Sequence, residues 1–171
     1  MNKLSIVCLA AAGLSSCTGS KTTQSESGNA DNKSARQPNI VILLTDDQGY
    51  GDMKCYGSPR LQTPNLDRLA AEGTRFTNFY AGAAASTPSR AALLTGRYAE
   101  RVGVPGVVDD TSENGIKRSE ITLAEYLKQN DYATGIVGKW HLGYQPEYLP
   151  LRHGFTEFFG LPYSNDMWPY H

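Results

Sequence analysis

A hydroxyl residue and an arginine flank a proline in the segment Ser86-Thr87-Pro88-Ser89-Arg90. Proline is favoured in the first turn of a helix, and the unpaired amide groups of that turn favour negative charge. An anionic substrate could therefore be held beside Ser86 and Arg90. Residue types alone favour a simpler interpretation, in which Ser86 and Thr87 only cap the helix and Arg90 makes a surface ion pair.

Two adjacent acids, Asp46 and Asp47, directly follow a short apolar run at residues 40–44. Such a run is typical of a parallel strand that is buried on both faces. Open α/β sheets bind ligands at the carboxyl ends of their strands, so the sequence predicts both carboxylates at a ligand-binding edge. A solvated or ion-paired turn is the alternative, and the two acids taken alone favour it.

Three segments carry helix signals, at residues 63–73, 87–96 and 122–130. The first has proline at its first position and glycine just past its end. In the second, Thr87 is the expected cap and Pro88 the expected first residue. The third opens with a capping box of Thr and Glu three residues apart. Its expected buried stripe comprises Leu123, Tyr126 and Leu127.

Residues 75–80 and 132–138 have the composition and alternation of further strands. Strands and helices then alternate along the chain, which predicts the α/β class with a mainly parallel sheet flanked by helices. The segment after residue 143 is rich in proline, tyrosine and phenylalanine, and we expect it to be irregular.

The amino terminus has the order of a secretory signal, with one early positive charge and an apolar segment that ends at Leu14-Ser15-Ser16-Cys17. This tetrapeptide resembles the lipobox of bacterial lipoproteins, in which the cysteine is acylated. We therefore expect residues 1–17 to be a lipoprotein signal peptide, with lipidation at Cys17 and anchoring of the exported protein to the periplasmic or outer face of a bacterial membrane. An ordinary signal peptide with an incidental cysteine is the alternative.

Residues 18–37 are almost entirely polar, so they predict a flexible tether. The formal net charge of −1 gives no electrostatic footprint for nucleic acid, and no nucleic-acid partner is expected. No apolar run approaches the roughly 20 residues of a membrane-spanning helix. Once the signal is removed and Cys17 is lipidated, Cys55 is the only remaining thiol, which excludes an internal disulfide and a cysteine zinc cluster.

Three segments together resemble the sulfatase family. Residues 84–97 resemble its first signature, residues 132–143 resemble its second, and residues 38–47 are similar to its opening strand and metal-binding acids. The resemblance implies that residues 38–171 are the amino-terminal part of an alkaline-phosphatase-like sulfatase domain, incomplete in this chain. It also reverses the simpler interpretations of the serine and of the paired acids.

The resemblance assigns the nucleophile and the metal. It implies that a maturation enzyme, of the anaerobic radical class that acts on serine, oxidises Ser86 to formylglycine. Arg90 would stabilise the modified residue and its charge. Asp46, Asp47 and residue 86 would bind one calcium ion, which usually takes six to eight oxygen ligands. The further ligands, commonly an Asp-Asn pair, would then come from residues beyond this sequence.

The remaining site residues follow from the second signature. Lys139 would contact the sulfate ester, and His141 would hydrogen-bond the hydrated formylglycine and act as an acid or base, since its ordinary pKa is about 6.5. Asp131 departs from the family, which usually has glycine there, and Ala85 stands where a larger or hydroxylic residue is commoner. His153 has no assigned role, and lining the pocket and supporting the structure remain alternatives.

The implied activity is that of an arylsulfatase-like sulfuric ester hydrolase acting on a sulfate ester, with a sulfated glycan among the candidate substrates. These 171 residues alone are expected to be inactive and poorly soluble. A non-catalytic protein that binds sulfated glycans is one alternative. A phosphate or phosphonate ester hydrolase of the same superfamily is another.

Overall fold

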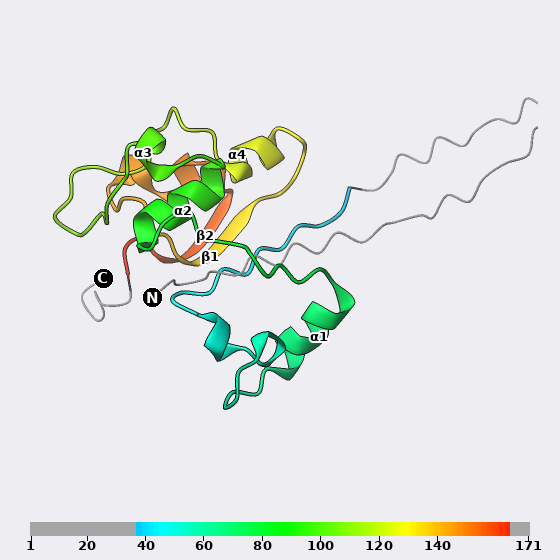
Figure 1. Cartoon of the computed structure of the whole chain (residues 1–171). Coiled ribbons are helices and arrows are strands. Elements are labelled where there is room, and N and C mark those ends of the chain that lie inside the picture. Colours follow the sequence, from blue (N-terminus) through cyan, green and yellow to red (C-terminus); the bar gives the residue numbers. More distant parts are fainter. Residues whose placement is uncertain (1–36, 165–171) are drawn as a thin grey trace, which may run out of the picture.

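The computed structural model describes residues 37–164. The expected signal peptide, the lipidation site Cys17 and the tether up to residue 36 lie outside the described residues. The described part combines short helices with a small parallel sheet, which places the chain in the α/β class as the sequence predicts (Figure 1).

Two parallel strands form the sheet. Strand β1 spans Gly135–Lys139 and strand β2 spans Glu157–Leu161, and their register pairs Gly135 with Glu157 and Lys139 with Leu161. The connection between them contains 3-10 turns at Pro146–Tyr148 and Pro150–Arg152. The first strand confirms the prediction for residues 132–138. The second lies where an irregular segment was expected, so that expectation is wrong.

Four α-helices accompany the sheet in the described residues (Figure 1). They are α1 (Pro64–Glu72), α2 (Ser86–Thr95), α3 (Ala99–Val102) and α4 (Leu123–Lys128). Helix α1 packs against a 3-10 turn at Lys54–Tyr56, which follows another at Tyr50–Asp52. Helices α2 and α3 pack on each other and contribute to the core beside the sheet.

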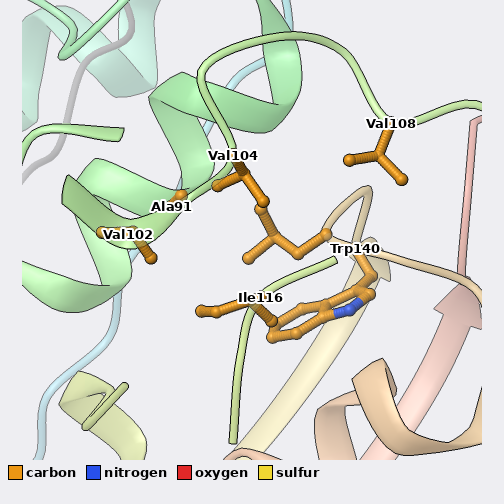
Figure 2. Close-up of a cluster of buried hydrophobic side chains, with 7 residues drawn as sticks. Ala91, Val102, Val104, Val108, Ile116 and Trp140 are labelled. Carbon is orange, nitrogen blue, oxygen red and sulfur yellow. The ribbon is translucent and has the colours of Figure 1, made fainter. Parts of the chain in front are cut away.

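The core joins helices α2 and α3 to the loop after α3 and to the residues that follow β1 (Figure 2). Ile116 and Leu142 are fully buried, and Trp140 is 1% exposed. Ile136 of β1 and Phe158 of β2 pack against the cluster, so one face of the sheet is covered. The buried cluster consists of Ala91, Val102, Val104, Val108, Ile116, Trp140 and Leu142. The site-bearing end of β1 is thus held by packed side chains.

Two predicted strands do not form. Residues 40–44 are extended but unpaired, and Val41 and Leu43 are 67% and 60% exposed. Residues 75–80 are irregular with a bend at residues 77 and 78, and the carbonyls of Phe76 and Thr77 accept hydrogen bonds from tyrosine hydroxyl groups. A strand requires a partner ladder, and neither segment has one within residues 37–164.

The helix signals are largely confirmed, with shifted ends. Helix α2 starts at Ser86 with Ala85 as its N-cap, so Pro88 is its third residue and not its first. Thr122 caps α4 in a complete capping box, but the helix ends at Lys128. The expected buried stripe is wrong for Tyr126, which is 59% exposed. Ala124 is the buried residue of this helix.

Candidate active site

Ser86 and Arg90 lie one turn apart on α2. The Nε atom of Arg90 donates a hydrogen bond to Ser86 Oγ at 3.1 Å. This contact follows from helix geometry, since residues four apart lie on the same face. Because Ser86 is the first residue of α2, its hydroxyl lies beside amide groups that have no partner within the helix. Both features favour negative charge next to residue 86.

Arg90 also connects the other two motifs. Its Nη1 atom donates to the backbone carbonyl of Lys139 at 2.6 Å, and its Nη2 atom lies 3.5 Å from Asp46 Oδ1. Lys139 Nζ lies 3.0 Å from Asp46 Oδ2. Residues that are far apart in the sequence therefore meet around one carboxylate at the carboxyl end of β1. This is where the sequence places ligand-binding groups.

The charges in this cluster shift two pKa values. Partial burial alone would raise the pKa of Asp46, but Lys139 and Arg90 together outweigh it and lower that pKa below its ordinary value. Burial lowers the pKa of the Arg90 guanidinium, and Asp46 opposes that shift. Asp46 is therefore held as a carboxylate between two cations.

A small cavity of about 30 Å³ adjoins Ser86. Asp46, Asp47 and Ser89 are among the residues that line it, together with Arg90. Asp47 has a φ of 59°, in the left-handed region that a non-glycine residue seldom occupies. Such strained backbone conformations cluster at functional sites, and this one lies at the end of the 40–44 segment beside the cavity.

The oxygen atoms around this cavity match the donors that calcium prefers. Asp46 and Asp47 offer carboxylates and Ser86 offers a hydroxyl, all of which are hard oxygen ligands. Residues 37–164 contain no group of three or more histidine, cysteine, aspartate or glutamate side chains placed to hold a metal ion. The described residues therefore fit calcium as part of a coordination shell, and they do not complete it.

His141 lies two residues after Lys139 and is 5% exposed. Its backbone φ is 60°, and its amide donates to the carbonyl of Pro162 at 2.9 Å. The imidazole packs edge-on against Tyr163, with ring centroids 4.7 Å apart. Tyr163 is not among the predicted site residues, because its position beside His141 depends on β2, which was not predicted. Two parallel strands end at the same edge, so residues after β2 necessarily lie near those after β1.

His153 lies away from this cluster. Its side chain is fully buried and stacks on Trp140, with ring centroids 5.9 Å apart. Of the two alternatives for this residue, the structure therefore supports the structural one. Within the described residues, none of the helices is long and apolar enough to cross a membrane.

Comparison with known proteins identifies the family to which these motifs are common. The family model described as Sulfatase matches residues 38–171. Arylsulfatase A of Homo sapiens is 54% identical over 138 residues, which cover 79% of this chain and 27% of that protein. The chain thus spans about a quarter of the length of this curated relative.

Solved protein structures are also similar to this chain in fold and sequence. One from work on glycosaminoglycan metabolism by Bacteroides thetaiotaomicron has a TM-score of 0.67 and 43% identity, covering 72% of this chain and 28% of that one. Another protein, solved in complex with its substrate D-glucosamine-2-N,6-O-disulfate, has a TM-score of 0.55 and 40% identity, covering 66% of this chain and 21% of that one.

Proposed function

Because this chain belongs to the sulfatase family, we propose that the protein it represents hydrolyses sulfate esters at a site built on Ser86. The observation that carries the proposal is the position of Arg90, which contacts Ser86, Asp46 and the backbone of Lys139 at once. One guanidinium thereby joins all three segments that resemble the family. A helix cap alone would not require that arrangement.

The proposed nucleophile is a modified form of residue 86. A maturation enzyme would remove two hydrogens from the Ser86 side chain and leave formylglycine, an aldehyde. When hydrated, this group supplies two geminal hydroxyls, one to attack sulfur and one to expel sulfate afterwards. Unmodified serine has no second hydroxyl, so its sulfate ester would persist. The first residue of α2 is a suitable place, since its surroundings favour the developing negative charge.

The basic residues would bind and orient the sulfate group. Lys139 Nζ and the Arg90 guanidinium supply fixed positive charge where sulfuryl oxygens accumulate negative charge. Asp46 holds both cations in place through its two carboxylate oxygens. His141 would donate a hydrogen bond to the modified residue and move a proton during turnover.

A calcium ion would be held by Asp46, Asp47 and residue 86, together with ligands from elsewhere in the protein. When bound, the ion supplies positive charge that lowers the pKa of an oxygen attached to it. Asp46 would then exchange part of its pairing with Lys139 and Arg90 for metal coordination. The strained backbone of Asp47 presents the second carboxylate beside the first.

The proposed substrate class is a sulfate ester, with sulfated sugars favoured by the comparisons. One similar structure contains a disulfated glucosamine as its substrate. The positive groups beside residue 86 match the anionic part of such a molecule.

The proposal is tested by mass spectrometry of the Ser86 peptide. Protein from cells that contain the serine-type maturation enzyme should carry an aldehyde at residue 86, two mass units below serine. A Ser86→Ala variant should show no such change. Finding only unmodified serine in protein from those cells would contradict the proposed nucleophile. Comparing turnover of the sulfate and phosphate esters of one phenol by the full-length protein separates sulfatase from phosphatase activity.

We extend the proposal to localisation through Cys17. An acylated Cys17 would anchor the exported protein to a membrane surface without a spanning helix, since each buried methylene contributes roughly 0.8 kcal/mol. Labelling with a fatty-acid analogue should mark the wild type in the membrane fraction. Cys17→Ser should lose both label and membrane association. An unlabelled wild-type protein would leave only an ordinary signal peptide.

A further inference from the structure

His153 is a buried titratable residue that the proposed chemistry does not use. Its side chain is 0% exposed, and within residues 37–164 neither ring nitrogen makes a hydrogen bond of good geometry, although the backbone of Glu147 lies close enough to interact with the ring. A buried polar group without a good hydrogen bond is already unfavourable, and a buried charge in the same position is more so. The folded protein therefore favours the neutral imidazole strongly over the protonated one.

The ring of His153 supports Trp140. The two rings stack at 5.9 Å between centroids with an interplanar angle of 30°. Trp140 is 1% exposed, and its Nε1 atom donates to the carbonyl of Tyr148 at 2.8 Å. Trp140 stands between Lys139 and His141, the two residues proposed to contact substrate and nucleophile. Moving the indole would therefore move the backbone that carries both.

The backbone at His153 is fixed on both sides. Its carbonyl accepts a hydrogen bond from Thr122 Oγ1 at 2.7 Å, and the carbonyl of Gly154 accepts one from Thr134 Oγ1 at 2.6 Å. Gly154 has a φ of +89°, and a Cβ there would lie 2.3 Å from the backbone nitrogen of Glu125. The corner packs too closely to rotate, so a charged ring could reach water only if the corner opened.

Charges around the ring act in both directions. Burial has the largest effect and lowers the pKa of His153. The charge of Arg118 also lowers this pKa. The charge of Glu125 on α4 and a hydrogen-bond interaction with the backbone of Glu147 raise it. The folded-state pKa is lowered below the ordinary value of about 6.5. Between the folded-state pKa and about pH 6.5, the unfolded chain therefore binds more protons than the folded protein. Stability is complete above about pH 6.5 and is lost as the pH falls from there toward the folded-state pKa.

We propose that neutral His153 positions the Lys139–His141 segment through Trp140, and that protonation of its ring releases this support. That Lys139 and His141 act on substrate rests on the proposed function. The coupling between His153 and Trp140 does not, because it is a contact between two buried rings. In an active protein the release would appear as loss of turnover on the acidic side, beyond any titration of the reacting groups.

Fluorescence of Trp140 tests the coupling in the full chain. The sequence has two tryptophans, so Trp168→Phe leaves Trp140 as the only indole. A protonated imidazole in contact with indole quenches its emission. We expect the denaturant midpoint to be constant above about pH 7 and to fall below about pH 6.5, where the unfolded chain takes up a proton. Emission of the folded protein should fall reversibly at a lower pH, where the ring is protonated in the folded state. His153→Phe keeps an aromatic ring but cannot titrate, so it should lose both changes.

His171→Phe is the matched control, since it removes another of the three histidines and should keep both changes. Constant Trp140 emission from about pH 7.5 down to the onset of acid unfolding would overturn the proposal, as would His153→Phe with wild-type pH dependence. Should His153→Phe fail to fold, an NMR titration of the wild-type His153 ring decides, and a pKa at or above 6.5 overturns it. Trp140 fluorescence and the denaturant midpoint do not depend on turnover. A protein that shows the coupling between His153 and Trp140 but no activity would therefore contradict only the proposed function.

Discussion

Arg90 decides how the candidate site is assembled, because its side chain directs three nitrogen atoms at three different partners. The acceptors are a hydroxyl on its own helix, a backbone carbonyl at the end of β1, and a carboxylate after the 40–44 segment. The planar guanidinium can make these contacts together, whereas a lysine ammonium is a single flexible charge. Shape, more than charge, is therefore what this position requires.

We predict that Arg90→Lys destabilises the protein by about 1–3 kcal/mol, because partly buried acceptors lose their donors while the charge is kept. Urea unfolding of purified full-length protein measures this loss. The matched control is Arg68→Lys, at a side chain that is 71% exposed in an i,i+4 pair with Glu72, where the change should stay within about 0.5 kcal/mol. Equal effects at the two positions would show that Arg90 does not organise the cluster.

The backbone conformation of Asp131 explains why the family usually has glycine at this position. It has a φ of 64° just after α4, where the amide of Tyr132 donates to the carbonyl of Leu127 at 3.2 Å. This bond pattern closes a helix with a left-handed residue, for which glycine is favoured. The glycine that the family usually has is thus a backbone requirement, and aspartate meets it with some strain.

We expect Asp131→Gly to raise the free energy of unfolding by up to about 1 kcal/mol, since the left-handed conformation costs glycine nothing. Asp110→Gly is the comparison, in an exposed turn where φ is not positive, and should be neutral or destabilising. Thermal and urea unfolding of both variants give the sign. A destabilised Asp131→Gly would mean that the aspartate side chain contributes more than its backbone strain costs.

At the level of elements, helices were easier to predict than strands. The caps and prolines of α1, α2 and α4 are local signals, and those helices form close to their predicted positions. Residues 40–44 and 75–80 carry strand composition, but a strand also needs a neighbour that composition does not specify. The missed strand β2 shows the same limit, since its existence depends on β1 about twenty residues earlier.

The cap of α4 also supports the corner at His153. Thr122 is 1% exposed; its hydroxyl accepts from the amide of Glu125 at 3.2 Å and donates to the carbonyl of His153. We predict that Thr122→Ala costs about 1–3 kcal/mol, because it removes a cap and leaves a buried carbonyl unpaired. Thr122→Ser keeps the hydroxyl and should retain most of the stability. A serine variant as unstable as alanine would point to the methyl group instead.

At the scale of the molecule, the candidate site came from family motifs and not from spacing. Asp46 and Lys139 are 93 residues apart, and residue types alone favoured a solvated or ion-paired turn for the first and gave no role to the second. The resemblance placed them in one site, and the structure brings them within an ion-pair distance. The position of His141 against Tyr163 required the fold, because it depends on where β2 ends.

One face of the sheet is bare in the described residues. Val137 and Phe159 are paired in register and are 81% and 79% exposed, whereas their neighbours Ile136 and Phe158 pack on the core. An apolar sheet face next to unpaired extended segments is prone to self-association. We predict that these 171 residues expressed alone form concentration-dependent oligomers. Val137→Lys should reduce them, because a charge on that face opposes stacking.

Sedimentation velocity over a range of protein concentrations measures this association. Val107→Lys is the matched control, since Val107 is 52% exposed, lies in the loop between α3 and α4 and should leave association unchanged. If Val137→Lys associates as strongly as the wild type, a surface other than this sheet face drives it. Where this sheet face is covered by other parts of the protein, we expect Val137→Lys to be destabilising. A lysine buried there would lower stability by several kcal/mol, because its charge would lose water without gaining a partner.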